Sequence, residues 1–224
     1  MEKFIHVERC DSTQDILKEQ LALSGDVDLT VSCEHQTNGH GRGNNIWQDS
    51  PGTLCFSMTI KPHIQVTYTA LEISLLIHRF FSQKGKEIKV KWPNDLLTFE
   101  EKKCGGVLIQ NSGNHYYAGI GLNLFQNAHT YGDIYDVSFP LDKKEWAKEL
   151  SHFIRENRYI STELLTSDWL KSCVHLNREV KIIEGDQETS GEFIGLGPFG
   201  EALIKNSQGI HQIFNGSLRL FSFV

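Results

Sequence analysis

A rigid turn followed by a lysine is the first part of this chain whose residue types could do chemistry. Positions 91–95 read Lys-Trp-Pro-Asn-Asp; the proline biases the tryptophan away from helix, and Asn and Asp are typical turn residues. Lys103 follows, at the entry to an apolar strand that opens with Gly105 and Gly106. Because glycines there let a ligand pack beside the lysine, we interpret Lys103 as functional.

A glycine-rich loop at positions 36–47 is the second candidate. Glycines alternate at positions 39, 41 and 43, so the backbone can approach a ligand without steric cost. Arg42, and His40 when protonated, place positive charge in this loop, as an anion site requires. Taken alone, the segment is equally typical of an ordinary surface turn.

A third candidate is the apolar strand Gly119-Ile120-Gly121-Leu122-Asn123-Leu124. Glycines inside a strand weaken it unless something packs flat against the backbone. The pattern therefore favours a planar, mostly apolar ligand.

The elements that must position these residues change character along the chain. Up to about residue 174 the hydrophobic spacing alternates between strand and helix patterns, which predicts an α/β (α+β) domain with a mixed sheet and flanking helices. Short strands separated by Gly, Asn and Asp follow, the pattern of a small β-barrel. We therefore expect two domains, 1–174 and 175–224. The helices are expected at 13–21, 69–81, 143–158 and 161–173, and the strands at 29–33, 53–60, 89–92, 105–110, 116–124, 180–183, 189–196, 202–205, 210–214 and 218–221.

Composition excludes several classes of protein. With 39% apolar and 22% charged residues the chain is globular rather than disordered. It has no apolar run of spanning length and no signal-like start, so we expect a cytoplasmic protein. A net charge of −6 disfavours non-specific DNA binding. The five cysteines form no CxxC pair, and we expect isolated, mostly buried thiols.

Together, these blocks resemble those of the biotin–protein ligases. The resemblance covers more than half of the chain, and the blocks keep the family's order and spacing: Asp11-Ser12-Thr13; the loop from Gly39 to Trp47; the Lys-Trp-Pro-Asn-Asp box from Lys91 to Asp95; Lys103-x-x-Gly106; and Gly119-x-Gly121-x-Asn123. The end of the chain resembles the family's SH3-like β-barrel, and the part before it the family's class II synthetase-like, SH2-like catalytic domain. His40 and Asn44 stand where the family usually has Arg and Gly.

The resemblance implies roles residue by residue. The expected catalytic residues are Lys103, Arg42 and Asp95. The expected biotin-binding residues are Ser12, Thr13, Gln36, His40, Gly41, Arg42, Trp47, Lys103, Gly106, Gly119 and Gly121. The expected nucleotide-binding residues are Asn94, Asp95, Asn123 and Arg219, with Tyr131 and Tyr135, in the stretch 127–139, as guesses for the adenine cover. The metal ligands are left open.

The implied reaction uses ATP and Mg²⁺ to convert biotin to biotinyl-AMP, then passes the biotinyl group to a lysine of a carrier protein. The carrier would be the biotin carboxyl carrier protein of acetyl-CoA carboxylase or of a similar biotin-dependent carboxylase. A homodimer is compatible with the sequence. Family members that repress transcription carry a DNA-binding arm of about eighty residues before the Asp-Ser-Thr block; ten residues precede it here, so we expect no DNA binding. Two alternatives stay open: a lipoate–protein ligase, and a biotin-binding module without catalysis.

Overall fold

A seven-stranded mixed sheet forms the centre of the computed structural model, which describes residues 3–24, 28–43, 45–125 and 131–221. Its strand order is β1-β2-β5-β9-β8-β7-β6, parallel between β1 and β2 and antiparallel elsewhere. The strands are β1 (Lys3–Cys10), β2 (Leu29–Gln36), β5 (Thr53–Ile60), β6 (Lys89–Lys91), β7 (Asp95–Leu97), β8 (Lys103–Ser112) and β9 (His115–Asn123). The expected mixed sheet is confirmed.

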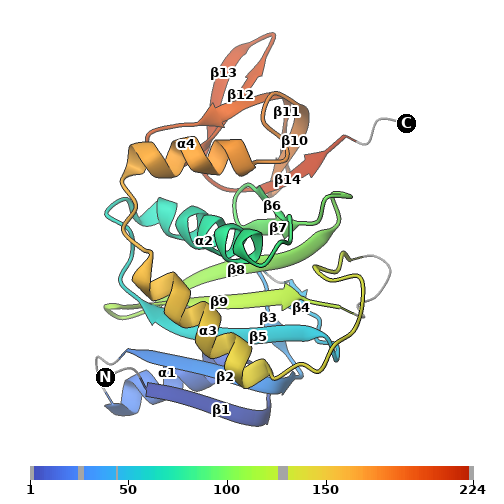
Figure 1. Ribbon diagram of the computed structural model, residues 1–224. Coiled ribbons are helices and arrows are strands. Elements are labelled where there is room, and N and C mark those ends of the chain that lie inside the picture. The colour runs from blue at the N-terminus through green and yellow to red at the C-terminus, as the bar shows by residue number, and fades with distance from the viewer. Residues whose placement is uncertain (1–2, 25–27, 44, 126–130, 222–224) are drawn as a thin grey trace.

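Helices cover both faces of this sheet (Figure 1). On one face lie α2 (Thr69–Gln83), which follows the 3-10 turn Val66–Tyr68, and α3 (Lys143–Glu156). Their apolar sides complete the main core with the inward side chains of β5, β8 and β9. On the other face, α1 (Thr13–Ser24) buries Leu17 and Leu21 against Leu29 and Val31 in a second, smaller core. None of the described helices is long and apolar enough to cross a membrane.

Local sequence explains where these helices begin. Ser12 caps α1: its hydroxyl accepts from the Gln14 backbone amide at 3.3 Å, and its carbonyl accepts from the amide of Ile16. Asp142 caps α3 through the Glu145 amide at 3.0 Å, and Ser161 caps α4 (Thr162–Ser172). The expected helix positions are confirmed to within three residues.

Four strands were not predicted from the sequence, each for a physical reason. β1 reads Phe-Ile-His-Val-Glu-Arg, in which polar and apolar residues do not alternate cleanly, because an edge strand needs little burial. β7 spans three residues, too few for any periodicity. β3 (Gly39–His40) and β4 (Ile46–Trp47) form a two-residue ladder inside the segment that we expected to be an irregular loop.

A five-stranded antiparallel sheet follows α4, in the order β13-β12-β11-β10-β14. Its strands are β10 (Glu179–Glu184), β11 (Gln187–Leu196), β12 (Ala202–Asn206), β13 (Gly209–Ile213) and β14 (Ser217–Leu220). Its buried side chains join the main core of the first sheet. At the junction the Trp92 indole donates to the Gly200 carbonyl at 3.0 Å, and the Tyr68 hydroxyl donates to the Gly197 carbonyl at 3.0 Å. The two sheets are therefore packed against each other.

His175, in the segment between α4 and β10, is fully buried at this junction. Its ring lies between those of Trp169 and Phe193, and its Nε2 has no hydrogen-bond partner among the described residues. Burial, with the nearby charges of Lys91 and Arg178, lowers the pKa of His175 to about 3. At a pH between this value and the usual 6.5 of a histidine, the imidazole of His175 is therefore neutral in the folded protein but protonated in the unfolded chain.

This difference predicts acid sensitivity. Between pH 6.5 and pH 3 the unfolded chain binds one more proton at His175 than the folded chain does, so stability is lost as pH falls through this window. From pH 7 to pH 5 the expected loss from this residue is about 2 kcal/mol. Urea unfolding of the wild type and of His175→Phe at both pH values measures it. The same loss in both proteins would contradict the prediction.

Candidate active site

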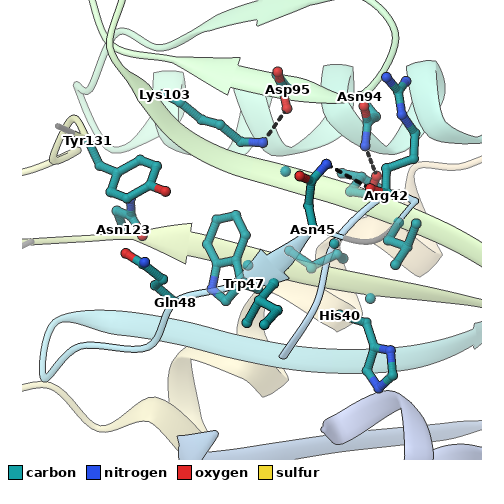
Figure 2. A pocket seen from close by; sticks show the side chains of 18 of the residues that line it. His40, Arg42, Asn45, Trp47, Gln48, Asn94, Asp95, Lys103, Asn123 and Tyr131 are labelled. Atoms are coloured by element: carbon teal, nitrogen blue, oxygen red, sulfur yellow. Dashed lines mark hydrogen bonds and ion pairs between the residues drawn. The ribbon is translucent and has the colours of Figure 1, made fainter. Parts of the chain in front are cut away.

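One cleft of about 810 Å³ lies where the two sheets meet, and residues of both sheets line it (Figure 2). All fifteen residues to which the resemblance assigned a catalytic, biotin-binding or nucleotide-binding role line it, although they come from six separate segments of the chain. They are Ser12, Thr13, Gln36, His40, Gly41, Arg42, Trp47, Asn94, Asp95, Lys103, Gly106, Gly119, Gly121, Asn123 and Arg219.

The polar end of the cleft is built on the first turn of α1. The Thr13 backbone amide donates to the Gln36 side-chain oxygen at 2.9 Å, and the Thr13 and Ser57 hydroxyls lie 2.7 Å apart. Ser12, Thr13, Gln36 and Ser57 are all buried, so their groups are held in place. They offer a compact set of donors and acceptors to a small polar ring. Ser57 was missed because the spacing of Thr53 to Ile60 predicts only a strand.

The apolar middle of the cleft depends on glycines. A Cβ on Gly121 would lie 2.4 Å from the Trp47 ring, so the indole packs directly on that strand. A Cβ on Gly119 would lie 2.6 Å from the side chain of Gln14, which is buried and donates to the Leu108 carbonyl at 3.2 Å. Side chains of the protein, Trp47 and Gln14, thus pack on these two glycines in place of the ligand that the sequence predicted there. Gln14 was missed, although it directly follows Ser12 and Thr13.

Gly106 differs from the other two glycines. A Cβ there would meet its nearest neighbours, including the Lys103 ammonium group, only at 3.7 Å. The backbone of β8 is therefore open toward the cleft beside Lys103, as the sequence analysis expected.

Lys91, Asp95 and Lys103 form one charged network. Lys91 Nζ lies 2.7 Å from one oxygen of Asp95, and Lys103 Nζ lies 2.6 Å from the other. The sheet produces this arrangement, because Lys91 pairs with Asp95 across β6 and β7 while Asp95 pairs with Gly106 across β7 and β8. The Lys103 ammonium also lies 5.9 Å from the centre of the Trp47 ring. Lys91, to which the sequence assigned no role, is thus part of the site.

The network decides how Asp95 can act. Burial alone would raise the pKa of Asp95, but the two ammonium groups outweigh it and hold the pKa below its usual value. A carboxylate that two ammonium groups stabilise in its charged form is a poor proton acceptor. Its geometry suits a different task, which is to fix the position of Lys103.

Arg42 reaches out of the glycine-rich loop to the second sheet. Its guanidinium donates to the Gly216 carbonyl and to the Ser217 hydroxyl, the latter at 3.3 Å. Burial lowers the pKa of Arg42 and the charge of Asp95 offsets this in part, but a guanidinium stays charged at neutral pH. Among its described contacts no carboxylate pairs with this cation at ion-pair distance, so a bound anion would be a stronger partner than the neutral groups it now meets.

His40 turns away from the centre of the cleft (Figure 2). Its Nε2 lies 2.9 Å from the Asp15 carboxylate on α1. Its imidazole is therefore directed at a carboxylate of the protein, whereas the Arg42 guanidinium meets only the neutral groups of Gly216 and Ser217. Asn44, the other departure from the family pattern, lies outside the described residues.

The residues assigned to the nucleotide also line the cleft. The Asn94 amide donates to the Val107 carbonyl at 2.6 Å, which ties the turn to β8. Asn123 is buried at the end of β9, and Arg219 is exposed on β14. Tyr131 lines the cleft and lies near Asn123 (Figure 2). Tyr135 does not: its ring packs against Phe81, Phe139 and Trp146 in the core, so it cannot cover a nucleotide there.

Comparison with known proteins adds to this geometry. A model described as the biotin/lipoate A/B protein ligase family matches residues 6–124. The bifunctional ligase/repressor BirA of Escherichia coli K12 is 25% identical, covering 95% of this chain and 72% of its own. BirA of Bacillus spizizenii is 22% identical, with coverages of 96% and 73%. The biotin protein ligase from Aquifex aeolicus, solved in complex with biotin and ATP, is 27% identical, with a TM-score of 0.82 and coverages of 99% and 100%. Since the family model spans more than half of the chain and nearly all of the cleft residues, this protein belongs to the biotin/lipoate A/B protein ligase family.

Proposed function

We infer that the protein is a biotin–protein ligase, an enzyme that activates biotin with ATP and transfers it to a lysine of a carrier protein. The observation that carries this inference is that one cleft collects a polar end, a glycine- and tryptophan-lined middle, and two cations, Lys103 and Arg42. A bicyclic ring with a polar edge, an aliphatic tail and a carboxylate needs these three environments in this combination.

The first step joins the biotin carboxylate to the α-phosphorus of ATP and releases pyrophosphate. A carboxylate with a pKa of about 4.5 is already ionised at neutral pH, so this step needs no general base. Its difficulty is electrostatic, because an anion must approach a polyanion. We propose that Lys103, held by Asp95, and Arg42 neutralise and align the two reacting groups. Gly106 leaves room for the ligand next to the Lys103 ammonium.

ATP would bind as its Mg²⁺ complex. In the described part of the chain no group of three or more His, Cys, Asp or Glu side chains is placed to hold a metal ion. Mg²⁺ commonly binds through substrate phosphates with few protein ligands, and bound in that way it would neutralise phosphate charge. We propose that Asn94, Asn123 and Arg219 contact the nucleotide and that Tyr131 contributes to its cover.

The second step is attack of the carrier lysine on the mixed anhydride. This amine, with a pKa of about 10.4, must lose a proton. Because its pKa is depressed, Asp95 suits the orientation of Lys103 better than acceptance of that proton. The substrate is a biotin-carrying protein; that it belongs to acetyl-CoA carboxylase or a similar carboxylase is our proposal.

Biotin-dependent exchange of labelled pyrophosphate into ATP tests the proposed function. A biotin–protein ligase should show exchange that depends on biotin and is not supported by lipoate. Exchange with lipoate instead would make the protein a lipoate ligase. Biotin binding without exchange would make it a binding module.

Arg42→Gly should release biotinyl-AMP faster while leaving biotin entry nearly unchanged. The loss of one charged contact costs on the order of 1.5–3 kcal/mol, or roughly ten- to a hundredfold in retention. Free anhydride would then label lysines on an added bystander protein, which a blot for biotin detects. His40→Gly is the matched control. It also introduces a glycine into this loop, but it removes a side chain that is directed at Asp15. Equal labelling by both variants would contradict the role of Arg42.

Two further expectations remain proposals. We propose a division into domains at residues 174 and 175, where α4 gives way to the second sheet; the core shared by the sheets implies that the parts depend on each other. We also propose that the enzyme works in the cytoplasm. A homodimer is compatible with its sequence.

A further inference from the structure

Lys91 lies on the three-residue strand β6 and lines the cleft. Its ammonium lies 2.7 Å from one oxygen of Asp95, and the Lys103 ammonium lies 2.6 Å from the other oxygen (Figure 2). The side chains of Lys91 and Asp95 are each 16% exposed, whereas that of Lys103 is 39% exposed. Of the two lysines, Lys103 is therefore the one more open to a ligand, and Lys91 is the more enclosed partner of the carboxylate.

Both neighbours of Lys91 anchor the chain at this point. The Val90 carbonyl accepts from the Val174 amide at 3.1 Å, and the Trp92 indole donates to the Gly200 carbonyl at 3.0 Å. Val90 and Trp92 are also buried in the main core. The backbone that carries Lys91 is thus held on both sides, which lets its side chain hold another group in place.

Lys91 also determines the net charge of the network. Lys103 and Asp95 by themselves would be a neutral pair, so the carboxylate that orients the Lys103 ammonium would also cancel its charge. With Lys91 included, two ammonium groups share one carboxylate, and one positive charge remains. Because a biotin carboxylate and a phosphate are both anions, this remaining charge is what a ligand of the cleft would meet.

We propose that Lys91 is a positioning residue for the activation of biotin: through Asp95 it holds Lys103 in place and keeps one positive charge available to the reacting anions. The inference rests on the proposed function of the protein. Lys91 fixes one oxygen of the Asp95 carboxylate, and the other oxygen orients the Lys103 ammonium. In this role Lys91 exchanges no proton and makes no contact with a ligand.

A double-mutant cycle in biotin-dependent pyrophosphate exchange tests this role. Lys91→Met should lower the maximal exchange rate by about tenfold or more, an effect of the size found among groups that share one ion-pair network. In an Asp95→Asn background the same substitution should change the rate by less than about threefold, because the carboxylate through which Lys91 acts is already gone. Equal losses in the two backgrounds would overturn the proposal and show that Lys91 contacts a ligand directly.

Lys89→Met is the matched control. Lys89 lies on the same strand and pairs with Glu87 at 2.7 Å, but it does not line the cleft, so exchange should stay near the wild-type rate. Lys91→Gln is a second test variant, since it keeps a hydrogen-bond donor beside Asp95 and removes the charge. It should be slowed as well, and near wild-type exchange in Lys91→Gln would refute the need for a second positive charge.

Calorimetry with biotin alone separates positioning from general support of the cleft. Biotin affinity should fall by less than the exchange rate in Lys91→Met, because the interaction that Lys91 supports is strongest in the transition state. An equal fall in affinity and rate would overturn the proposal, since it would mean that Lys91 only maintains the shape of the cleft. Wild-type protein without biotin-dependent exchange would refute the proposed function, a result distinct from any pattern among the Lys91 variants.

Discussion

Lys103→Ala should slow biotin-dependent pyrophosphate exchange by two to three decades while the protein stays folded. Removal of one preorganised charge that faces a developing transition state costs about 10²–10³ in rate. The side chain is 39% exposed and its truncation leaves no core cavity, so the unfolding temperature should change little. Asp95 keeps Lys91 as a partner, which limits the damage to the network.

The matched control is Lys102→Ala. Lys102 precedes Lys103 directly, but its side chain is exposed and does not line the cleft. Exchange should therefore stay near the wild-type rate in this variant. Near wild-type exchange in a folded Lys103→Ala protein would remove Lys103 from the mechanism, and with it the main cation of the site.

Glu72→Ala should produce the largest loss of stability. Glu72 on α2 is completely buried and pairs with Arg158 at 2.9 Å, while its other oxygen accepts from the amides of Tyr159 and Ile160 at 2.6 and 3.1 Å. This one carboxylate thus organises the turn between α3 and α4. Its removal leaves a buried guanidinium without a charge partner, which costs on the order of 3–5 kcal/mol. For a chain of this size the unfolding temperature should fall by roughly 10 °C, as calorimetry can measure.

Glu149→Ala is the control for this prediction. Glu149 on α3 also pairs with a basic residue, Lys84 at 2.6 Å, but its side chain is 54% exposed. A solvent-exposed pair contributes about 0–1 kcal/mol, so the unfolding temperature should hardly move. Similar losses in both variants would show that burial of Glu72 does not determine the cost. Glu72 does not line the cleft, and biotin affinity well below the unfolding temperature should be unchanged in either variant.

Sequence reasoning succeeded where a property depends on neighbours along the chain. The Ser12 cap, the strand from Thr53 to Ile60 and the helix that begins at Lys143 follow from local spacing and capping, which operate over a few residues. Motif order likewise selected fifteen residues that line one cleft, although the guess of Tyr135 as part of that lining was wrong. It did not find β7, which is too short to have a period, or Gln14, whose contact with Gly119 joins residues far apart in sequence.

The residue types of the cleft, their order, and hence the family and its chemistry could be determined from the sequence alone. What each charged group does depended on tertiary structure. Strand pairing places Asp95 between two lysines and so lowers its pKa. Tertiary packing directs His40 toward Asp15 and brings Arg42 to Gly216 and Ser217. The physical reason is that electrostatic and hydrogen-bond energies depend on distances through space, which the spacing along a chain does not specify.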